Sequence, residues 1–431
     1  MRAAPAALLR RGALMLSGEM LQSAFHFALN IVLIHQLAPT DYGIFAIVML
    51  MGGLALTYMR SLAGLPANLL IPAHAGRRRA LPFEVTFGTV AALSALAMGL
   101  ATAALLALWL RSDSLVAGGA FVALWALRSY LRSLAFAKGR QGEASLGDLT
   151  FALTGALLVA GFALGWRGAD PLNSVFMLLA AANGAGILMA LGLARRWPRL
   201  TLRRSMRRRY GTIGRQVLWS VLGTTTTNIQ GQGQVMLIAA CAGPAAYAPL
   251  AAMTVMFAPL RMLTAAIGNM VQPELARLWQ AGATEAALRI ARRWTLGVAL
   301  VGILYGAVVV TLVPFLRFPV FDGQPVLLIG LLTFATALPP LFYLMPRLLL
   351  EVRRSFRLAA AIGLAGAAIG MGLVALILLV ATPPWALVGA FASEATVLAG
   401  SLLAILRPEA LRFRGSGAGA KTWAPARRAG A

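Results

Sequence analysis

The feature that most constrains this sequence is a series of apolar runs, each close to 20 residues long. A helix needs about 20 residues to cross roughly 30 Å of hydrocarbon, and in lipid it satisfies all its own backbone hydrogen bonds. We therefore expect an all-α polytopic membrane protein. The twelve predicted spans are 12–36, 42–59, 85–110, 114–137, 146–166, 172–194, 213–240, 245–264, 293–315, 325–350, 357–380 and 383–406.

Composition agrees with this fold class and excludes several kinds of chemistry. Hydrophobic residues make up 60% of the chain and charged residues 12%, whereas a soluble domain is about 25% charged. The single Cys241 excludes an internal disulfide, and the three widely spaced histidines show no metal-ligand pattern. The sequence also lacks a nucleotide-binding loop of the Walker type. We therefore expect no metal ion and no cofactor.

The basic residues predict the orientation of the chain in the membrane. When the links between the predicted spans are numbered, 35 of the 38 Lys and Arg residues fall on or towards the side of the N-terminus. Only Arg111, Arg167 and Arg317 fall on the other side. Positive residues in short links mark the cytoplasmic side. We therefore expect a multi-pass protein of the bacterial inner membrane with both termini in the cytoplasm.

The most basic stretch, "RRWPRLTLRRSMRRRYGTIGR", would suggest a nucleic-acid-binding arm if it stood alone. Here it lies between the sixth and seventh predicted spans, on the basic side of the membrane. We interpret it as a cytoplasmic linker that contacts anionic lipid headgroups, and we expect no nucleic acid partner.

A short turn occurs twice, in "HQLAPTDYGIF" and in "CAGPAAYAPLA". Pro39 and Tyr42 match Pro244 and Tyr247 at an offset of 205 residues, and the later spans match when the offset rises to about 211. Because each half has an even number of spans, both halves enter the membrane in the same direction, as in a parallel transporter repeat. The predicted parts are two six-helix halves, 1–194 and 213–406, a basic cytoplasmic linker, 195–212, and a basic cytoplasmic tail, 407–431.

The first of these turns resembles the first hairpin of the Wzx-type polysaccharide flippases. In "ALNIVLIHQLAPTDYGIFAIVML" the matching residues are Leu37, Pro39, Asp41, Tyr42 and Gly43, while Ala38 replaces the usual Gly. The later stretch "MVQPELARLWQAG" is similar to the segment that follows the eighth helix of that family. The resemblance implies the MOP superfamily, which also contains the multidrug and toxin extruders, and two six-helix bundles arranged as in that superfamily.

The resemblance also implies an activity. It is the flipping of a polyprenyl-pyrophosphate-linked oligosaccharide to the outer leaflet for surface polysaccharide biosynthesis, by alternating access through a polar cavity between the halves. The expected unit is a monomer, working alone or beside a polysaccharide polymerase or ligase. One alternative is a multidrug or cation exporter of the same superfamily, although such pumps need anionic cavity residues. A second alternative is a membrane polysaccharide polymerase or ligase, an enzyme for which the outer links offer few catalytic side chains.

Polar residues inside the predicted spans are the candidate site, because a charge there costs about 2.5–3.5 kcal/mol on insertion scales. Arginines suit a pyrophosphate, amides and hydroxyls suit sugar hydroxyls, and a buried carboxyl can couple transport to protons. The candidate substrate-binding residues are Arg128, Arg132, Arg261, Gln22, His26, Asn30, Thr224, Thr227, Asn228, Gln230 and Gln234, and the candidate coupling residues are Glu19 and Glu394.

Structural roles remain open for the same residues. Arginines near the inner ends of helices can extend to the interface and only fix topology. Glu394 can serve as a partner for one of the arginines, and the Thr- and Gln-rich run of the seventh span can join helices. The stretch from Ser61 to Arg79 is interpreted as a cytoplasmic amphipathic loop or an interfacial segment.

Overall fold

The computed structural model describes residues 5–73, 77–166, 168–194, 200–353 and 355–406, and all regular structure among them is helical. The helices are α1 (Pro5–Gln36), α2 (Pro39–Met59), η1 (Arg60–Gly64), α3 (Leu65–Ala73), α4 (Arg77–Leu108), α5 (Leu115–Ala137), α6 (Gln141–Ala163), α7 (Pro171–Ala194), α8 (Arg204–Thr212), α9 (Gly214–Asn228), η2 (Ile229–Gly233), α10 (Gln234–Met256), α11 (Ala258–Gln280), α12 (Thr284–Leu312), η3 (Val313–Phe315), η4 (Pro319–Phe321), α13 (Val326–Val352), α14 (Phe356–Val380), η5 (Pro383–Ala386) and α15 (Leu387–Leu406).

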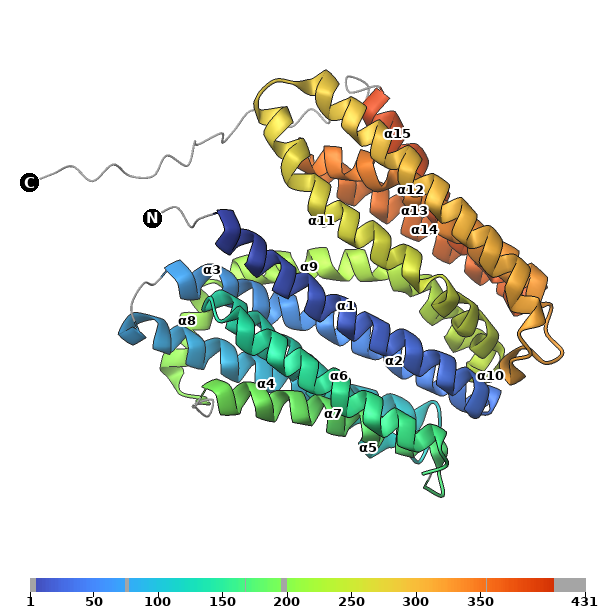
Figure 1. Ribbon diagram of the computed structural model, residues 1–431, viewed down its shortest axis with the longest axis horizontal. Coiled ribbons are helices and arrows are strands. Elements are labelled where there is room, and N and C mark those ends of the chain that lie inside the picture. The colour runs from blue at the N-terminus through green and yellow to red at the C-terminus, as the bar shows by residue number, and fades with distance from the viewer. Residues whose placement is uncertain (1–4, 74–76, 167, 195–199, 354, 407–431) are drawn as a thin grey trace, which may run out of the picture.

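These helices form two bundles, which Figure 1 shows one above the other. We call α1 to α7 the N-lobe and α9 to α15 the C-lobe. In the N-lobe, α5 packs against α2, α4 and α7, while α1 packs against α6. In the C-lobe, α13 packs against α12 and α15, and α15 also packs against α14. The short helix α8 links the two lobes.

The twelve predicted crossings are present in two sets of six. Nine helices of the described residues are long and apolar enough to span a membrane. The helices α1 and α5 add two more crossings. The long helix Gly214–Met256 supplies another, because it bends at Gly243, where φ is 80°, and its second limb leads into α11. The predicted fold class is therefore confirmed.

The two copies of the Pro-x-x-Tyr turn meet between the lobes. The first copy begins α2, and the second follows the bend at Gly243. A Cβ atom on Gly43 would overlap the backbone carbonyl of Pro244, so the two turns touch without an intervening side chain. Tyr42 and Tyr247 are both buried beside this contact. We call Tyr42, Gly43, Pro244 and Tyr247 the turn seal.

Two predicted boundaries differ most from the structure. The predicted loop after residue 59 is instead a continuous helix through the π-helical turn η1 and on to Ala73. The π-helical turn Arg60–Gly64 joins α2 to α3, and Pro66 is the second residue of α3, directly after that turn. The eighth predicted span ends at residue 264, whereas α11 continues to Gln280.

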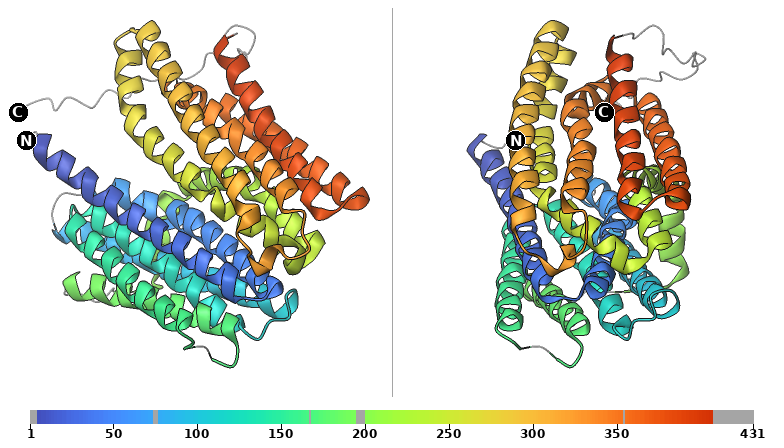
Figure 2. Two further views of the ribbon diagram at one scale, coloured as in Figure 1. Left: turned by 45° about the vertical axis from the view of Figure 1, so that its right-hand side comes forward. Right: turned by 90° about the vertical axis from the view of Figure 1, so that its right-hand side faces the viewer.

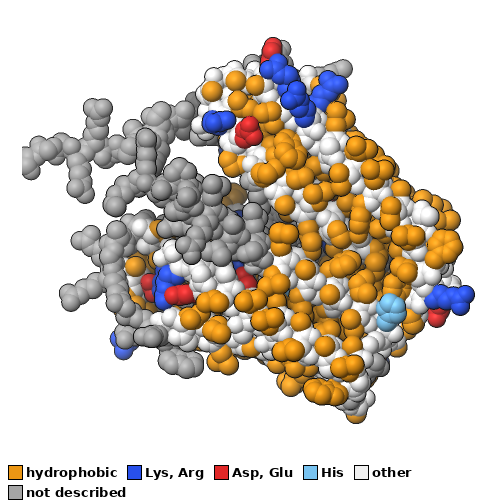
Figure 3. Space-filling model, viewed as in Figure 1, with side chains coloured by type: hydrophobic (Ala, Val, Ile, Leu, Met, Phe, Trp, Pro, Cys, Tyr) orange, Lys and Arg blue, Asp and Glu red, His pale blue; other side chains and the backbone are white. Residues whose placement is uncertain are grey.

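The lobes approach one another at one end and diverge at the end where the N-terminus lies (Figure 2). The contacts that join them involve α2 with α10, and η1 with α9. Hydrophobic side chains cover a broad band of the surface, and the charged side chains visible in Figure 3 lie at its margins. This distribution is that of a bundle surrounded by lipid.

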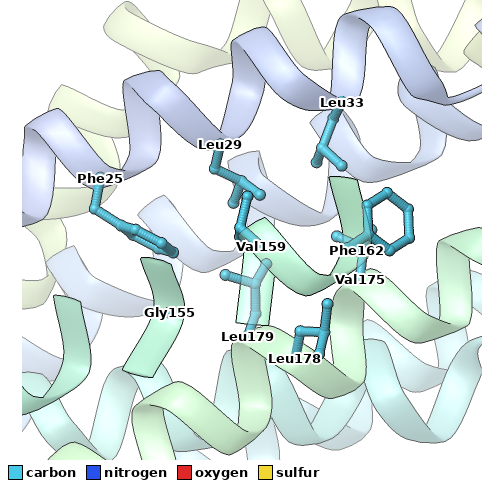
Figure 4. Close-up of a pocket in the computed structure, with 9 residues that line it drawn as sticks. All are labelled: Phe25, Leu29, Leu33, Gly155, Val159, Phe162, Val175, Leu178 and Leu179. Atoms are coloured by element: carbon cyan, nitrogen blue, oxygen red, sulfur yellow. The ribbon is translucent and has the colours of Figure 1, made fainter. Parts of the chain in front are cut away.

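Apolar packing holds α1 in the N-lobe. Figure 4 shows side chains of α1 directed at α6 and α7, and all nine lining residues are apolar or glycine. The space that remains among them is only about 10 Å³, which is hardly enough for one water molecule. The residues are Phe25, Leu29, Leu33, Gly155, Val159, Phe162, Val175, Leu178 and Leu179. This close-packed apolar contact therefore fixes the position of α1 and of the polar side chains that it carries.

Candidate functional site

Three charged side chains meet inside the N-lobe. Arg128 and Arg132 lie one turn apart on α5, and Asp148 lies on α6. Asp148 Oδ1 is 2.8 Å from Arg128 Nη1, and Asp148 Oδ2 is 2.9 Å from Arg132 Nε. We call these residues the N-lobe charge cluster. Two guanidinium groups share one carboxylate, so the cluster carries one positive charge in excess.

Arg128 is the most strongly held member of the cluster. Its Nε donates to Asn183 Oδ1 at 2.8 Å, and its Nη2 donates to Gln22 Oε1 at 3.0 Å. Its guanidinium also stacks over the ring of Phe151 at 3.9 Å. A buried charge is tolerated only when it is paired and hydrogen-bonded. Arg128 therefore joins α5, α6, α7 and α1 into one unit, and Arg132 is the more accessible arginine, with 18% of its side chain exposed against 6%.

Asp148 was missed by the sequence reasoning, although it lies inside the predicted fifth span. A signal was available, because two arginines one helical turn apart in lipid require a nearby anion. The close approach of α1 depends on Gly18, since a Cβ atom there would lie 2.6 Å from Asp148 Oδ2. The first helix therefore packs directly over the carboxylate.

A cavity of about 790 Å³ lies beside the cluster, between α4, α5, α6 and α7. Its walls are mostly aliphatic, and its charged lining adds two ion pairs to the cluster. Lys138 Nζ is 2.7 Å from Glu84 Oε2, and Arg140 pairs with Glu143. Because each of these pairs is neutral, the excess positive charge of the lining belongs to the cluster. The cavity thus combines apolar walls with a cationic group.

The polar stripe predicted on α1 divides into separate environments. Gln22 belongs to the charge cluster, as described above. Asn30 donates to the His26 carbonyl at 2.7 Å and accepts from Tyr42 Oη at 3.1 Å, so it ties α1 to the turn seal. The ring of His26 lies 5.1 Å from that of Trp125, and neither ring nitrogen has a hydrogen-bond partner in the described part of the chain. The side chain of Glu19 lies outside the described residues.

Three polar residues of the seventh crossing hydrogen-bond to the N-lobe. Thr224 and Asn228 hydrogen-bond to the N-lobe, through Ser61 Oγ and Thr57 Oγ1. Between them, Thr225 bonds to Tyr58 at 3.0 Å. These bonds join the lobes, a role that the sequence left open for this run.

The remaining residues of this crossing face elsewhere. Gln230 and Gln234 are buried against α14, where Gly363 and Gly370 leave room for them. Thr227 is exposed. Only part of the predicted run therefore takes part in the contact between the lobes.

The C-lobe has a smaller polar group. Tyr343 Oη on α13 donates to Glu394 Oε2 on α15 at 2.7 Å, and Arg347 is a close electrostatic neighbour of both. Adding 211 to Arg132 and Asn183 gives 343 and 394, so the two polar groups occupy repeat-related positions. Arg261 lies apart from this group, exposed on α11.

The structure thus brings Gln22, Arg128 and Arg132 together and separates them from the other candidates. No group of three His, Cys, Asp or Glu side chains that could hold a metal ion occurs among the described residues. What the N-lobe arrangement offers chemically is an anion-binding position next to an apolar cavity. The assignment of individual residues to substrate contact stays a prediction.

Comparison by sequence gives no match to any family model, and no curated protein matches significantly. Comparison by structure gives clear matches over almost the whole chain. An inward-facing multidrug resistance MATE family transporter of the MOP superfamily aligns with a TM-score of 0.64 at 12% identity, covering 92% of this chain and 96% of that one. The chain has the fold of the MOP superfamily transporters.

Two further structures with the MOP fold agree. An outward-facing MATE family transporter aligns with a TM-score of 0.57 at 14% identity, and a mutant of the Vibrio cholerae MATE transporter VcmN aligns at 0.61 and 13%. Each covers 94% of this chain and 96% of its own. The score is higher for the inward-facing example than for the outward-facing one.

Proposed function

We propose that this protein is an exporter that moves a polyprenyl-pyrophosphate-linked oligosaccharide across the bacterial inner membrane by alternating access of its two lobes. The observation that carries the proposal is the N-lobe cavity, in which two arginines share one carboxylate beside aliphatic walls. An excess cation next to apolar surface suits an anionic group attached to a lipid. The MOP fold supplies the expectation of a transporter.

Arg132 is the better placed arginine for the pyrophosphate. Both arginines line the cavity, and 18% of the Arg132 side chain is exposed against 6% of the Arg128 side chain. A guanidinium binds a phosphate through two parallel hydrogen bonds. Lys138 and Arg140 line the same cavity but are each paired with a glutamate, so the net positive charge of the lining stays at the cluster.

The contacts between the lobes support alternating access. At the end where the lobes approach, the turn seal holds the two copies of one turn against each other. With both termini in the cytoplasm, as the basic residues predict, this seal lies on the outer side, and the lobes are open to the inside. The outward-open state then requires the turn seal to separate while the inner ends close.

A multidrug or cation exporter is the second candidate, favoured by the printed descriptions of the neighbouring structures and by one group in the C-lobe. Glu394, bonded to Tyr343, is a carboxylate within a spanning helix and is suited to a cation or a coupling proton. A polysaccharide polymerase or ligase finds less support. Asp170, one of the few acidic residues of the outer links, is bonded to Ser114 and to the backbone of Asn173.

Deletion of the gene separates these candidates. We expect the exported polymer to disappear and the lipid-linked oligosaccharide to accumulate on the cytoplasmic leaflet, with restoration by wild type and only weakly by Arg132→Gln. Arg289→Gln, which removes an exposed charge on α12, is the matched control. An unchanged polymer together with new sensitivity to cationic drugs would favour the second candidate. A polymer of shortened chains with normally flipped lipid would favour the polymerase.

A further inference from the structure

The linker helix α8 is fixed to the N-lobe by polar contacts. Tyr210 Oη donates to the backbone carbonyl of Leu62 at 2.8 Å. That carbonyl lies in the π-helical turn η1, where the regular hydrogen-bond ladder is interrupted. Arg209 donates to the Pro82 carbonyl at 3.1 Å and to Thr86 Oγ1 at 3.3 Å, and it lies over the ring of Phe83. One face of α8 therefore packs against η1 and α4.

These contacts also place α8 at the level of the lipid headgroups. The apolar span within α4 begins at Ala80, and Arg209 contacts the first two turns of that span. Large apolar side chains are exposed on both sides of α8 in the sequence, namely Leu200, Leu202 and Trp219. An exposed tryptophan next to a basic helix is typical of a segment lying in the membrane interface.

The opposite face of α8 is strongly basic. Arg204, Arg207 and Arg208 are exposed, as is Arg203 at the N-cap, whereas Met206 is buried on the docked side. Topology alone requires basic residues only somewhere in a cytoplasmic link. Here the contacts of Arg209 and Tyr210 orient the helix so that Arg204 and Arg208 face away from the docked side, with Arg203 and Arg207 exposed beside them.

We propose that this face of α8 binds the phosphates of anionic phospholipids of the inner leaflet. The occupant follows from the charge of the face and from its level beside the start of α4. The helix ends at Thr212, the backbone leaves the helical region at Ile213, and α9 of the C-lobe begins at Gly214. Lipid bound to α8 therefore holds the point at which the lobes are connected. The proposal does not depend on what the protein exports.

The test uses the full chain in detergent, titrated with phosphatidylglycerol or with zwitterionic phosphatidylcholine. Because a ligand that binds the folded state raises its unfolding temperature, we expect phosphatidylglycerol to raise the midpoint of thermal unfolding more than phosphatidylcholine does. Each basic residue near an anionic surface contributes about 1 kcal/mol. The triple variant R203Q/R204Q/R207Q should therefore lower the apparent affinity for phosphatidylglycerol by at least about tenfold.

Two variants make the result specific. R289Q/R292Q/R293Q removes the same charge from exposed positions of α12 in the C-lobe and should keep the response. R203K/R204K/R207K keeps the charge and should retain most of it, which guards against a triple Gln variant that fails to fold. An unchanged response of R203Q/R204Q/R207Q, an equal loss in both Gln variants, or a lost response in a well-folded Lys variant would overturn the proposal.

Discussion

At the scale of single residues, the N-lobe charge cluster depends on how a buried cation is stabilised. Arg128 is 5% exposed and Asp148 is 3% exposed, so neither charge is compensated by water. Breaking one partner of a buried pair leaves an unpaired charge, whereas removing both partners costs less. Asp148 also keeps Arg128 and Arg132 from facing one another as like charges.

Asp148→Asn should therefore destabilise the protein by about 3–5 kcal/mol, because two guanidinium groups lose their shared anion. The measurement is thermal unfolding of the purified protein in detergent. In the double variant Arg128→Gln/Asp148→Asn the loss should be clearly smaller than the sum of the two single losses. Additive losses would mean that the two residues do not act as a pair.

Gly18→Ala should lower the unfolding temperature by displacing α1 from α6, since its Cβ atom would lie 2.6 Å from Asp148 Oδ2. Gly184→Ala on α7 is the matched control, because a Cβ atom there meets nothing within 4 Å. A helical Gly→Ala change in open space is stabilising by roughly 0.5–1 kcal/mol. Equal effects of both substitutions on the unfolding temperature would disprove the close approach at Gly18.

At the scale of elements, the crossings were predictable from the sequence because length and apolar composition suffice to identify a spanning helix. The continuation into α3 was not, because Gly64 and Pro66 usually end a helix and a π-helical turn has no clear sequence signal. The sequence predicted that the Pro-x-x-Tyr turn occurs twice. It did not predict that the two copies touch, since contact between two turns depends on how the lobes pack.

In the candidate site, too, features set by spacing along one helix were predictable from the sequence, and contacts between helices were not. That Arg128 and Arg132 share a helix face follows from their spacing of four residues. That Asp148, Asn183 and Gln22 surround them follows only from the packing of α1, α6 and α7. The sequence placed these arginines between the halves, whereas the structure places them beside a cavity within the N-lobe.

Gly43→Ala should shift the population towards the state in which the turn seal is open, because its Cβ atom would overlap the carbonyl of Pro244. Spin labels at Asp113 and Gln324, exposed in the N-lobe and the C-lobe, report the separation of that end. We expect the long-distance population to increase relative to wild type. Unchanged distances, as expected for the Gly184→Ala control, would contradict the role of the turn seal.

At the scale of the whole molecule, the orientation in the membrane determines what each opening does. Single cysteines at Ser205 in α8 and at Asp113, in a chain whose exposed Cys241 is replaced by Ser, distinguish the two sides. An impermeant thiol reagent added to intact spheroplasts should label position 113 and leave position 205 unlabelled until the cells are opened. The reverse pattern would place the turn seal on the cytoplasmic side.

The docking of α8 should hold across the physiological pH range. Burial raises the pKa of Tyr210 to about 12, so its phenol keeps the proton that it donates to Leu62. Since the pKa is raised, this stabilisation is complete below about pH 10, the usual value for tyrosine, and is lost as the pH rises through the raised value. Tyr210→Phe should thus lower the unfolding temperature by the same amount at pH 6 and at pH 9. A loss of unfolding temperature that differs between pH 6 and pH 9 would contradict the assignment of this hydrogen bond.

The most direct test of the central claim is a flipping assay with purified protein in liposomes that contain a fluorescent polyprenyl-pyrophosphate-linked oligosaccharide. Movement to the other leaflet is followed by quenching from outside. The account predicts flipping by wild type and by Arg289→Gln. It predicts a rate about ten- to a hundredfold lower for Arg132→Gln, since a hydrogen bond to a charged group contributes about 1.5–3 kcal/mol. Wild-type rates for Arg132→Gln, or transport of a cationic dye without any flipping, would contradict it.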